Sequence, residues 1–519
     1  MIIVMNIPSV NKRIGLPTLF LLFSISILAV APHPSIGGVE PMRKSILKQH
    51  PLATSHRRMN QAVHATPFPT KGLLILAQFT DIKFDSINTQ IAYDSLANSS
   101  HYTFNGATGS CKQYFEDQSN GKYSPQFDVI GPVTLPHTAA YYGKDTAGTG
   151  NDRYIFDFVY DACREANNIG VDFAQYDFNR DNDVDLIYIV YAGYGQADGG
   201  EQATIWPHSW DIMSSLYFGY TNQSTYYVTC DEKTWDIIDY NLPMFDGKTL
   251  MTYACSNELN YSQKLRDGIG TICHEFSHLL GLPDYYITDN AYSHLKNQTP
   301  GSWSIMGSGN YLNESRTPPN YSAYDKYFLG WAEPSVLTQG QSISLPADQM
   351  TYFQVRKNGS PTGALCTDTV YYIENRQYEH WDAYLPGHGM LIWQVIYNEQ
   401  AWIDNSPNGP IVRYTLLSAD ESQSVYTSSS AGGNKPSIPF PGSLNVRTTR
   451  LFDTYLNQIE EINGIISLST SSSPMDPSSN IETIGSKTED ALYYNVLGIP
   501  VDPTRHKGIA IHKGAIIIL

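Results

Sequence analysis

The fold is decided by the stretch His274-Glu275-Phe276-Ser277-His278-Leu279-Leu280-Gly281-Leu282-Pro283-Asp284-Tyr285-Tyr286. The two histidines are four positions apart. Residues at this spacing project from the same face of a helix, so both imidazoles can bind one metal ion. Glu275 lies beside them and is free to transfer a proton. We therefore expect a zinc site on a helix, with Glu275 as its catalytic base.

The end of this helix predicts a third ligand. Gly281 permits a sharp turn of the backbone, and Pro283 prevents the helix from resuming, which would bring Asp284 back toward the histidines. Three protein ligands leave a fourth position for a water molecule, whose pKa zinc lowers to about 7 and whose proton the neighbouring glutamate could accept. A carboxylate further along the chain, such as Glu314 or Asp325, is the alternative third ligand.

Composition limits the classes of protein to consider. A chain of 519 residues is too long for one ordinary core, so we expect several folded units. The content of 37 Tyr, 39 Gly and 30 Pro favours a β-rich, turn-rich architecture. A net charge of -17 argues against nucleic acid and anionic membrane surfaces as partners. The six cysteines lack paired C-x-x-C spacing, so no structural zinc site of that type is expected.

The N-terminus has the layout of an export signal. Lys12 and Arg13 precede an apolar run that ends in Ala29-Val30-Ala31, which predicts a signal peptide over residues 1–31. We therefore expect a secreted protein, extracellular or at the cell surface, whose mature chain has no transmembrane span. Residues 32–70 are basic and interrupted by prolines, which is typical of the pro-segment of a zymogen or of a linker.

A catalytic domain of α+β type is predicted over residues 71–335. Buried strands and amphipathic helices alternate before the zinc helix, at Gly72–Phe79, Ser110–Gln118, Phe156–Ala166 and Leu186–Ala192. An exposed strand edge in such a domain could pair with an extended substrate, but the sequence does not indicate which strand forms it.

Two features follow the zinc helix. The glycine-flanked turn Gly301–Gly309 carries Met306, a candidate for an apolar floor under the metal. Residues 318–331 are predicted to form a helix that closes the domain.

An acidic loop precedes the strand Leu186–Ala192 and predicts a calcium site. Oxygen side chains alternate along it, at Asp177, Asn179, Asp181, Asp183 and Asp185. Such an array can enclose a hard cation, and like charges this dense repel one another without one. The loop is outside the EF-hand family because Tyr188 stands where an EF-hand has its bidentate glutamate. The alternative is a solvated acidic turn.

In the second half of the chain the sequence pattern changes to one of successive strands. Strand patterns separated by Gly, Pro and Asn occur at Thr369–Glu374, Gly389–Val395 and Arg413–Leu417, which predicts a β-sandwich-like domain over residues 336–470. Residues 471–519 are predicted to be a linker and a small C-terminal β domain.

The chain resembles the M6 family of secreted peptidases typified by immune inhibitor A. The resemblance extends over roughly residues 72–420 and is carried by Gly270–Tyr286, Trp303–Gly307, Ser322–Trp331, the acidic loop, Ile205–Trp210, Tyr372–Gln377 and Trp381–Gly389. It implies a metzincin-like zinc endopeptidase with calcium in its catalytic domain, acting on proteins or peptides, and we expect a monomer. It places zinc on His274 and His278, the base on Glu275 and Met306 beneath the metal.

The tail resembles the C-terminal sorting domain of type IX secretion. The matching stretches are Tyr494–Val501 and Lys507–Gly514, and the resemblance implies that the secretion machinery is a partner. The alternative is a final strand pair of the preceding β-rich domain.

Two questions of function remain open at this level. The donor that stabilises an oxyanion could be Tyr285, Tyr286 or His208, although packing is an equally simple role for each. The rivals to a peptidase are a non-catalytic surface protein stabilised by zinc and calcium, and a zinc enzyme that acts on another amide or an ester.

Overall fold

The computed structural model describes residues 68–146, 151–196, 200–201, 203–231, 237–260, 262–348, 350–420 and 436–475, and short strands between 493 and 518. The chain divides into two compact units, Met1–Ser472 and Ser473–Leu519. The predicted signal peptide and residues 32–67 of the predicted pro-segment lie outside the described residues. Within the described ranges, no helix combines the length and the apolar character needed to cross a bilayer.

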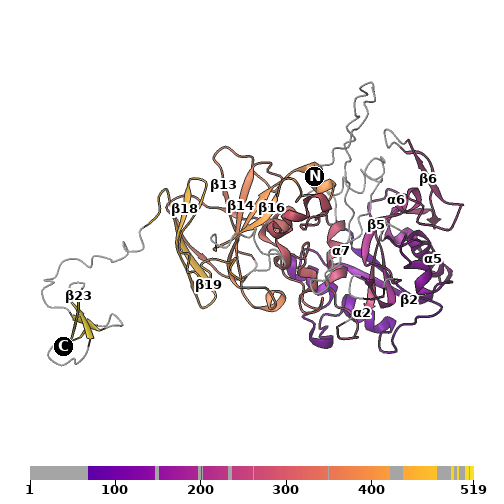
Figure 1. Ribbon diagram of the computed structural model, residues 1–519, viewed down its shortest axis with the longest axis horizontal. Coiled ribbons are helices and arrows are strands. Elements are labelled where there is room, and N and C mark those ends of the chain that lie inside the picture. The colour runs from indigo at the N-terminus through magenta and orange to yellow at the C-terminus, as the bar shows by residue number, and fades with distance from the viewer. Residues whose placement is uncertain are drawn as a thin grey trace, which may run out of the picture. The chain divides into compact units, whose positions relative to one another are not determined.

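A five-stranded mixed sheet forms the centre of the first half of the chain (Figure 1). Its strand order is β2 (Gln126–Thr134), β1 (Lys71–Gln78), β4 (Ile187–Tyr194), β10 (Thr252–Leu259) and β5 (His208–Asp211). The first four strands are parallel, and β5 lies antiparallel to β10 at one edge. The predicted strands Gly72–Phe79 and Leu186–Ala192 are present as β1 and β4. Strands β2 and β5 form the two edges of the sheet, and substrate pairing at either edge stays a prediction.

Helices cover both faces of this sheet, because side chains alternate along its apolar strands. Leu74 and Leu76 of β1 belong to one core with α3 (Cys111–Gln118) and the zinc helix α7 (Gly270–Leu279). Leu73 and Ile75 belong to a second core with α5 (Ile155–Asn168) and α6 (Ile212–Tyr217). The two predicted helices Ser110–Gln118 and Phe156–Ala166 are thus present, on opposite faces.

Glycines determine where α7 begins and ends. A Cβ atom on Gly270 would lie 1.8 Å from the carbonyl oxygen of Asn310, so only glycine allows this approach. At the other end Gly281 has φ +97°. The N–H groups of Gly281 and Leu282 donate to the carbonyls of His278 and Ser277 at 3.0 and 3.2 Å, which closes the helix in the usual glycine-terminated manner. The predicted sharp turn is present.

The helix predicted over residues 318–331 is shorter than expected. It is α8, Ala323–Phe328, and it begins only after Ser322, whose hydroxyl accepts a hydrogen bond from the Asp325 N–H at 3.0 Å. The preceding prolines lack the N–H that a helix interior requires. Gly330, at φ +72°, terminates the helix. The predicted glycine-flanked turn begins with the short 3₁₀ helix η6 (Gly301–Trp303), and a second, η7 (Gly309–Tyr311), starts at its last residue.

Two further sheets follow in the β-rich part (Figure 1). One has the order β11 (Ser335–Val336), β13 (Phe353–Arg356), β14 (Thr369–Arg376), β15 (Gly389–Ile396) and β16 (Tyr414–Leu417). The other has the order β12 (Ser342–Leu345), β19 (Ile465–Ser471), β18 (Thr454–Ile462) and β17 (Thr449–Leu451). Residues of both sheets, among them Ile373 and Ile466, share one hydrophobic cluster.

The opposite face of the five-stranded β-rich sheet packs onto the core of the zinc helix. Tyr372 and Trp393 lie in the same hydrophobic cluster as Phe276 of α7 and Met306. The predicted boundary at residues 335/336 therefore falls inside one compact unit, and the division into two domains there stays a prediction.

The unit Ser473–Leu519 has a sheet of its own. Its strands are β21 (Pro500–Val501), β20 (Tyr493–Asn495), β22 (Ile509–His512) and β23 (Ala515–Ile518), in that order. These strands pair with one another in antiparallel register. A sorting role for this unit stays a prediction.

Candidate metal centre

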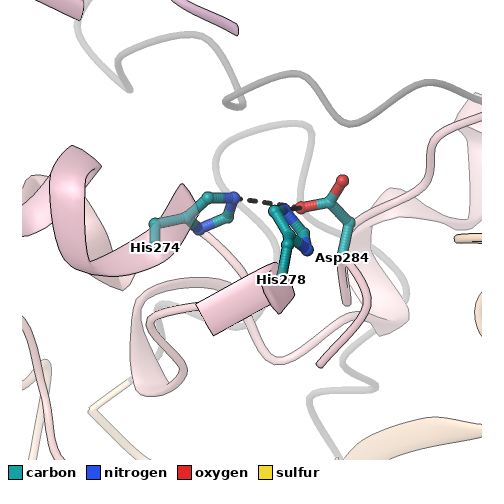
Figure 2. A group of neighbouring side chains, drawn as sticks. All are labelled: His274, His278 and Asp284. Carbon is teal, nitrogen blue, oxygen red and sulfur yellow. Dashed lines mark ion pairs between the residues drawn. The ribbon is translucent and has the colours of Figure 1, made fainter. Parts of the chain in front are cut away.

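The turn after α7 brings three side chains to one point. His274 and His278 project from the helix, and Asp284 faces them from the segment that follows (Figure 2). The carboxylate oxygen Oδ1 of Asp284 lies 3.1 Å from Nε2 of His274 and 3.4 Å from Nε2 of His278. One ligand atom of each residue lies within 4.8 Å of the others, and this is the only such group of three or more His, Cys, Asp or Glu side chains among the described residues.

Hydrogen bonds determine which ring nitrogens face this point. Nδ1 of His274 lies 2.7 Å from the carbonyl oxygen of Ile305, and Nδ1 of His278 lies 2.7 Å from that of Leu282. A carbonyl oxygen only accepts, so in each neutral imidazole Nδ1 carries the proton and Nε2 presents a lone pair. Two lone pairs and a carboxylate oxygen then converge in a buried site. These donor types and this number of protein ligands suit zinc.

The electrostatics of the three groups favour a bound cation. Burial alone would raise the pKa of Asp284, but the two imidazoles outweigh it and hold that pKa well below its usual range. Burial would lower the pKa of His274, yet the Asp284 carboxylate raises it. The carboxylate therefore remains ionised in a site that is 0% exposed at Asp284 and His274. A positive charge between the three groups would stabilise it.

Glu275 lies beside the three ligands. It is 1% exposed, and its Oε2 is 4.0 Å from Nε2 of His278. Burial raises its pKa to about 7, against the opposing effect of the two histidines. A carboxyl group with a pKa near neutrality is suited both to accepting and to returning a proton.

The turn that carries Met306 supports the site through its backbone. Met306 is fully buried, and its carbonyl accepts a hydrogen bond of 2.7 Å from the N–H of Tyr285. The preceding carbonyl, of Ile305, holds His274. The turn therefore hydrogen bonds both to His274 and to Tyr285, which follows the ligand Asp284.

The alternative third ligands are engaged elsewhere. The carboxylate of Asp325 accepts hydrogen bonds from the hydroxyls of Tyr285 at 2.8 Å and Tyr414 at 3.2 Å, and from the N–H of Ser322 at 3.1 Å. Glu314 accepts a hydrogen bond from Ser262. Neither carboxylate belongs to the group formed by the two histidines and Asp284.

Two of the three oxyanion candidates are held in the core. The hydroxyl of Tyr285 is bound to Asp325, and its ring stacks on Tyr414 with centroids 3.6 Å apart. His208 is 0% exposed, with Nε2 at 2.9 Å from the hydroxyl of Tyr253. Tyr286 is partly exposed and remains a candidate.

In the acidic loop, a carboxylate side chain is hydrogen bonded to backbone N–H groups of the loop itself. The carboxylate of Asp177 accepts hydrogen bonds from the N–H groups of Asp181 and Asn182 at 3.0 and 3.1 Å, and Asn182 has φ +74°. Asp183 lies in the short strand β3 (Asp183–Val184), which pairs with β9 (Lys248–Leu250). The ammonium group of Lys248 lies 2.7 Å from Asp177 and thus provides a positive charge at the loop. Calcium binding there stays a prediction.

A residue that the sequence did not indicate also contacts the site. Asn405 follows α9 (Glu399–Ile403), a helix between β15 and β16, and hydrogen bonds to Asp284 across 121 positions of sequence. No motif marks this asparagine. The only local signal is that asparagine tolerates the left-handed conformation found after a helix end.

Comparisons with known proteins relate part of the chain to a family of peptidases. The sequence model described as "Immune inhibitor A peptidase M6, catalytic domain" matches residues 75–332. The chain is 30% identical over 296 residues to immune inhibitor A of Bacillus thuringiensis subsp. alesti, which covers 50% of this chain and 39% of that protein. It is 27% identical over 335 residues to the pre-pro-metalloprotease PrtV of Vibrio cholerae serotype O1 (strain M66-2), over 56% of this chain and 33% of that one. The chain thus aligns with well under half the length of these relatives.

The matched segment contains the zinc helix, the turn with Met306 and every residue of the metal centre except Asn405. Residues 75–332 of this chain therefore match the catalytic domain of the M6 (immune inhibitor A) peptidase family.

Proposed function

We propose that this chain is an exported zinc endopeptidase that hydrolyses internal peptide bonds of protein substrates, with zinc held by His274, His278 and Asp284. One observation carries the proposal. Two Nε2 lone pairs and one carboxylate oxygen converge in a buried site that has a second buried carboxylate, that of Glu275, beside it. A structural zinc site has no need of this neighbour and is usually closed by a fourth protein ligand.

The chain's own residues have distinct roles in the reaction. A zinc ion in this site supplies a Lewis acid that polarises a carbonyl group and acidifies water. A carboxylate oxygen of Glu275 accepts the proton of the attacking water and then delivers it to the nitrogen of the leaving amine. Its raised pKa, about 7, suits both steps near neutral pH. We propose Tyr286, two positions after Asp284 in the chain, as the donor to the oxyanion.

The decisive experiment is Glu275→Gln in the mature chain, assayed on denatured casein with zinc content measured in parallel. We expect zinc to be retained and hydrolysis to fall about 10²- to 10⁴-fold, the usual contribution of a general base. A variant that digests casein at the wild-type rate would exclude this role of Glu275.

The same assay separates the rival functions. A wild-type chain that binds zinc but leaves casein intact with and without chelator would favour the non-catalytic surface protein. Turnover of small amide or ester substrates without casein cleavage would favour the third possibility, another zinc hydrolase.

We also propose calcium in the loop formed by Asp177, Asn179, Asp181, Asp183 and Asp185. Its support is the inward turn of the loop and the buried carboxylates of Asp183 and Asp185, which are 1% and 5% exposed. Calcium should raise the melting temperature of the wild type, and Asp181→Asn should reduce that increase. A melting temperature and an activity that are both indifferent to calcium would exclude the site.

Export and processing complete the proposal. We propose cleavage of a signal peptide near residue 31, removal of a pro-segment that ends near residue 70, and use of residues 471–519 by the secretion machinery. Mass spectrometry of the protein recovered from the medium would identify both mature termini. A recovered chain that still begins at residue 1 would contradict the first two steps.

A further inference from the structure

The third ligand of the metal centre is clamped by an asparagine from the β-rich part of the chain. Nδ2 of Asn405 donates a hydrogen bond of 2.6 Å to Oδ2 of Asp284. Oδ1 of Asn405 accepts a hydrogen bond of 2.6 Å from the backbone N–H of Asp284. The two residues thus form a closed ring of two hydrogen bonds, and both are buried, at 5% and 0% exposure.

The direction of the asparagine amide follows from chemistry alone. A backbone N–H can only donate, so the atom of Asn405 that faces the Asp284 N–H must be the carbonyl oxygen. The amide nitrogen then faces Oδ2 of Asp284. Only Oδ1 is left to face the histidines, at 3.1 and 3.4 Å from their Nε2 atoms. Asn405 therefore determines which oxygen, and how many oxygens, the carboxylate presents.

We propose that Asn405 is a positioning residue for the zinc site, which holds Asp284 as a ligand through one oxygen and so keeps a coordination position open. The inference rests on the proposed zinc function. A partner that hydrogen bonds to a metal-ligating carboxylate typically contributes 10- to 100-fold to metal affinity. With Oδ2 bound to Asn405, the carboxylate cannot turn to bind the metal through both oxygens.

The competing explanation is that Asn405 only ends helix α9. It has φ +51°, its N–H donates to the carbonyl of Trp402 at 3.2 Å, and the N–H of Ser406 donates to that of Ala401 at 2.8 Å. This is the standard helix termination with a left-handed residue, in which glycine is preferred to asparagine. If helix termination were the whole role, glycine would replace Asn405 without loss.

Neighbouring contacts show that the clamp is part of a larger attachment. The hydroxyl of Thr288 donates to the carbonyl of Asn405 at 3.0 Å. Nδ2 of Asn408 donates to the carbonyls of Tyr285 and Tyr414, at 2.8 Å each. Tyr285 and Thr288 both follow Asp284 in the chain, so Asn405 and Asn408 hold the segment that carries the ligand from Asp284 to Thr288. The zinc site therefore includes a part of the chain beyond the family match at residues 75–332.

The test is the zinc affinity of the full mature chain with Asn405→Gly, measured by competition with a chromophoric chelator. Glycine satisfies the left-handed backbone and removes only the side chain. We expect zinc affinity to fall 10- to 100-fold. The metal-free protein should also lose stability, because the buried N–H and Oδ2 of Asp284 lose their partner. Asn405→Asp is a second variant that keeps the shape but places a carboxylate against Oδ2, and its affinity should fall at least as far.

Asn398→Ala is the matched control. Asn398 caps the start of the same helix, where its side chain accepts a hydrogen bond of 2.8 Å from the N–H of Ala401. Its loss should lower the melting temperature of the metal-free chain but leave zinc affinity within about twofold, because the contact is to the helix and not to a ligand.

The outcomes separate this inference from the proposed function. If the wild type binds zinc and both Asn405 variants bind it within twofold of the wild type, the positioning role is wrong and the zinc peptidase stands. If the affinity falls equally in Asn398→Ala, the effect belongs to the helix and the inference is also wrong. A wild type that binds no zinc would overturn the proposed function together with this inference.

Discussion

Asp325 is a buried carboxyl group, so replacing it by asparagine should change how the stability of the protein depends on pH. Burial raises its pKa to about 6 from the ordinary 3.8, against the hydrogen bonds from Tyr285, Ser322 and Tyr414. The folded protein therefore holds this proton more tightly than the unfolded chain does. The resulting stabilisation is complete below about pH 4 and is lost as the pH rises through 6.

The magnitude follows from the two pKa values. A difference from 3.8 to about 6, at about 1.4 kcal/mol for each pH unit, corresponds to about 3 kcal/mol over the whole titration. About 2 kcal/mol of this falls between pH 4 and pH 7, because the unfolded carboxyl group is already partly ionised at pH 4. The variant Asp325→Asn has no titrating group at this position, and it loses at all pH values the carboxylate acceptor that two tyrosine hydroxyls share. Between pH 4 and pH 7 the stability difference between wild type and variant should thus shift by about 2 kcal/mol in favour of the variant.

The assay is urea unfolding of both proteins at pH 4, 5, 6 and 7. The contributions of the other titrating groups cancel when the free energy of unfolding of the variant is subtracted from that of the wild type. A difference that remains constant from pH 4 to pH 7 would refute the argument, because it would mean that the folded protein does not perturb this carboxyl group. The same variant tests the alternative zinc ligand. Zinc affinity should stay within about twofold of the wild type, and a loss of 100-fold or more would restore Asp325 as a ligand.

Three further predictions concern the metal centre. Gly281→Ala should lower the free energy of unfolding by about 1–2 kcal/mol, because residue 281 has a left-handed backbone, and it should also weaken zinc binding. The control Gly247→Ala, at φ +76° in a remote turn, should lower stability only. Equal zinc affinities of the two variants in a chelator competition would contradict this prediction. Tyr285→Phe should lower the free energy of unfolding in urea by about 1–3 kcal/mol, because a hydrogen bond to a buried carboxylate is lost, and should leave kcat unchanged. Tyr286→Phe should lower kcat about 10²-fold. The reverse pattern would exchange the roles of the two tyrosines. Removal of zinc with a chelator should lower the melting temperature, because a ligand present at 1,000 times its Kd stabilises the folded protein by about 4 kcal/mol. An unchanged melting temperature would exclude tight zinc binding.

Elements with a local signal were predicted well. Strands β1 and β4 are continuous apolar runs, and α3 and α5 carry apolar side chains at helical spacing, so both types of pattern are visible in the sequence. Strand β10 was not predicted because polar residues interrupt its pattern. Glu258 is one of them, and it is buried only because the N–H groups of Asp85 and Gly193, both distant in sequence, donate to it.

Elements whose ends depend on competing local preferences were predicted less well. The helix expected over residues 318–331 is reduced to α8, because the prolines at 318 and 319 exclude the first residues and a serine provides a cap four positions later. The arrangement of the β-rich part was also beyond the sequence. Its strands are visible as patterns, but the packing of Tyr372 and Trp393 against the core of the zinc helix is a contact between distant segments.

The metal centre shows the same division at the scale of single side chains. The sequence by itself determined the two histidines and Glu275, since the relative positions of residues four apart or adjacent follow from the geometry of one helix. It also determined that the chain turns at Gly281. Only the tertiary structure decided that Asp284 rather than Asp325 or Glu314 faces the histidines, and that Asn405 holds it there. These contacts join segments up to 121 positions apart, and no local preference of the chain specifies such a distance.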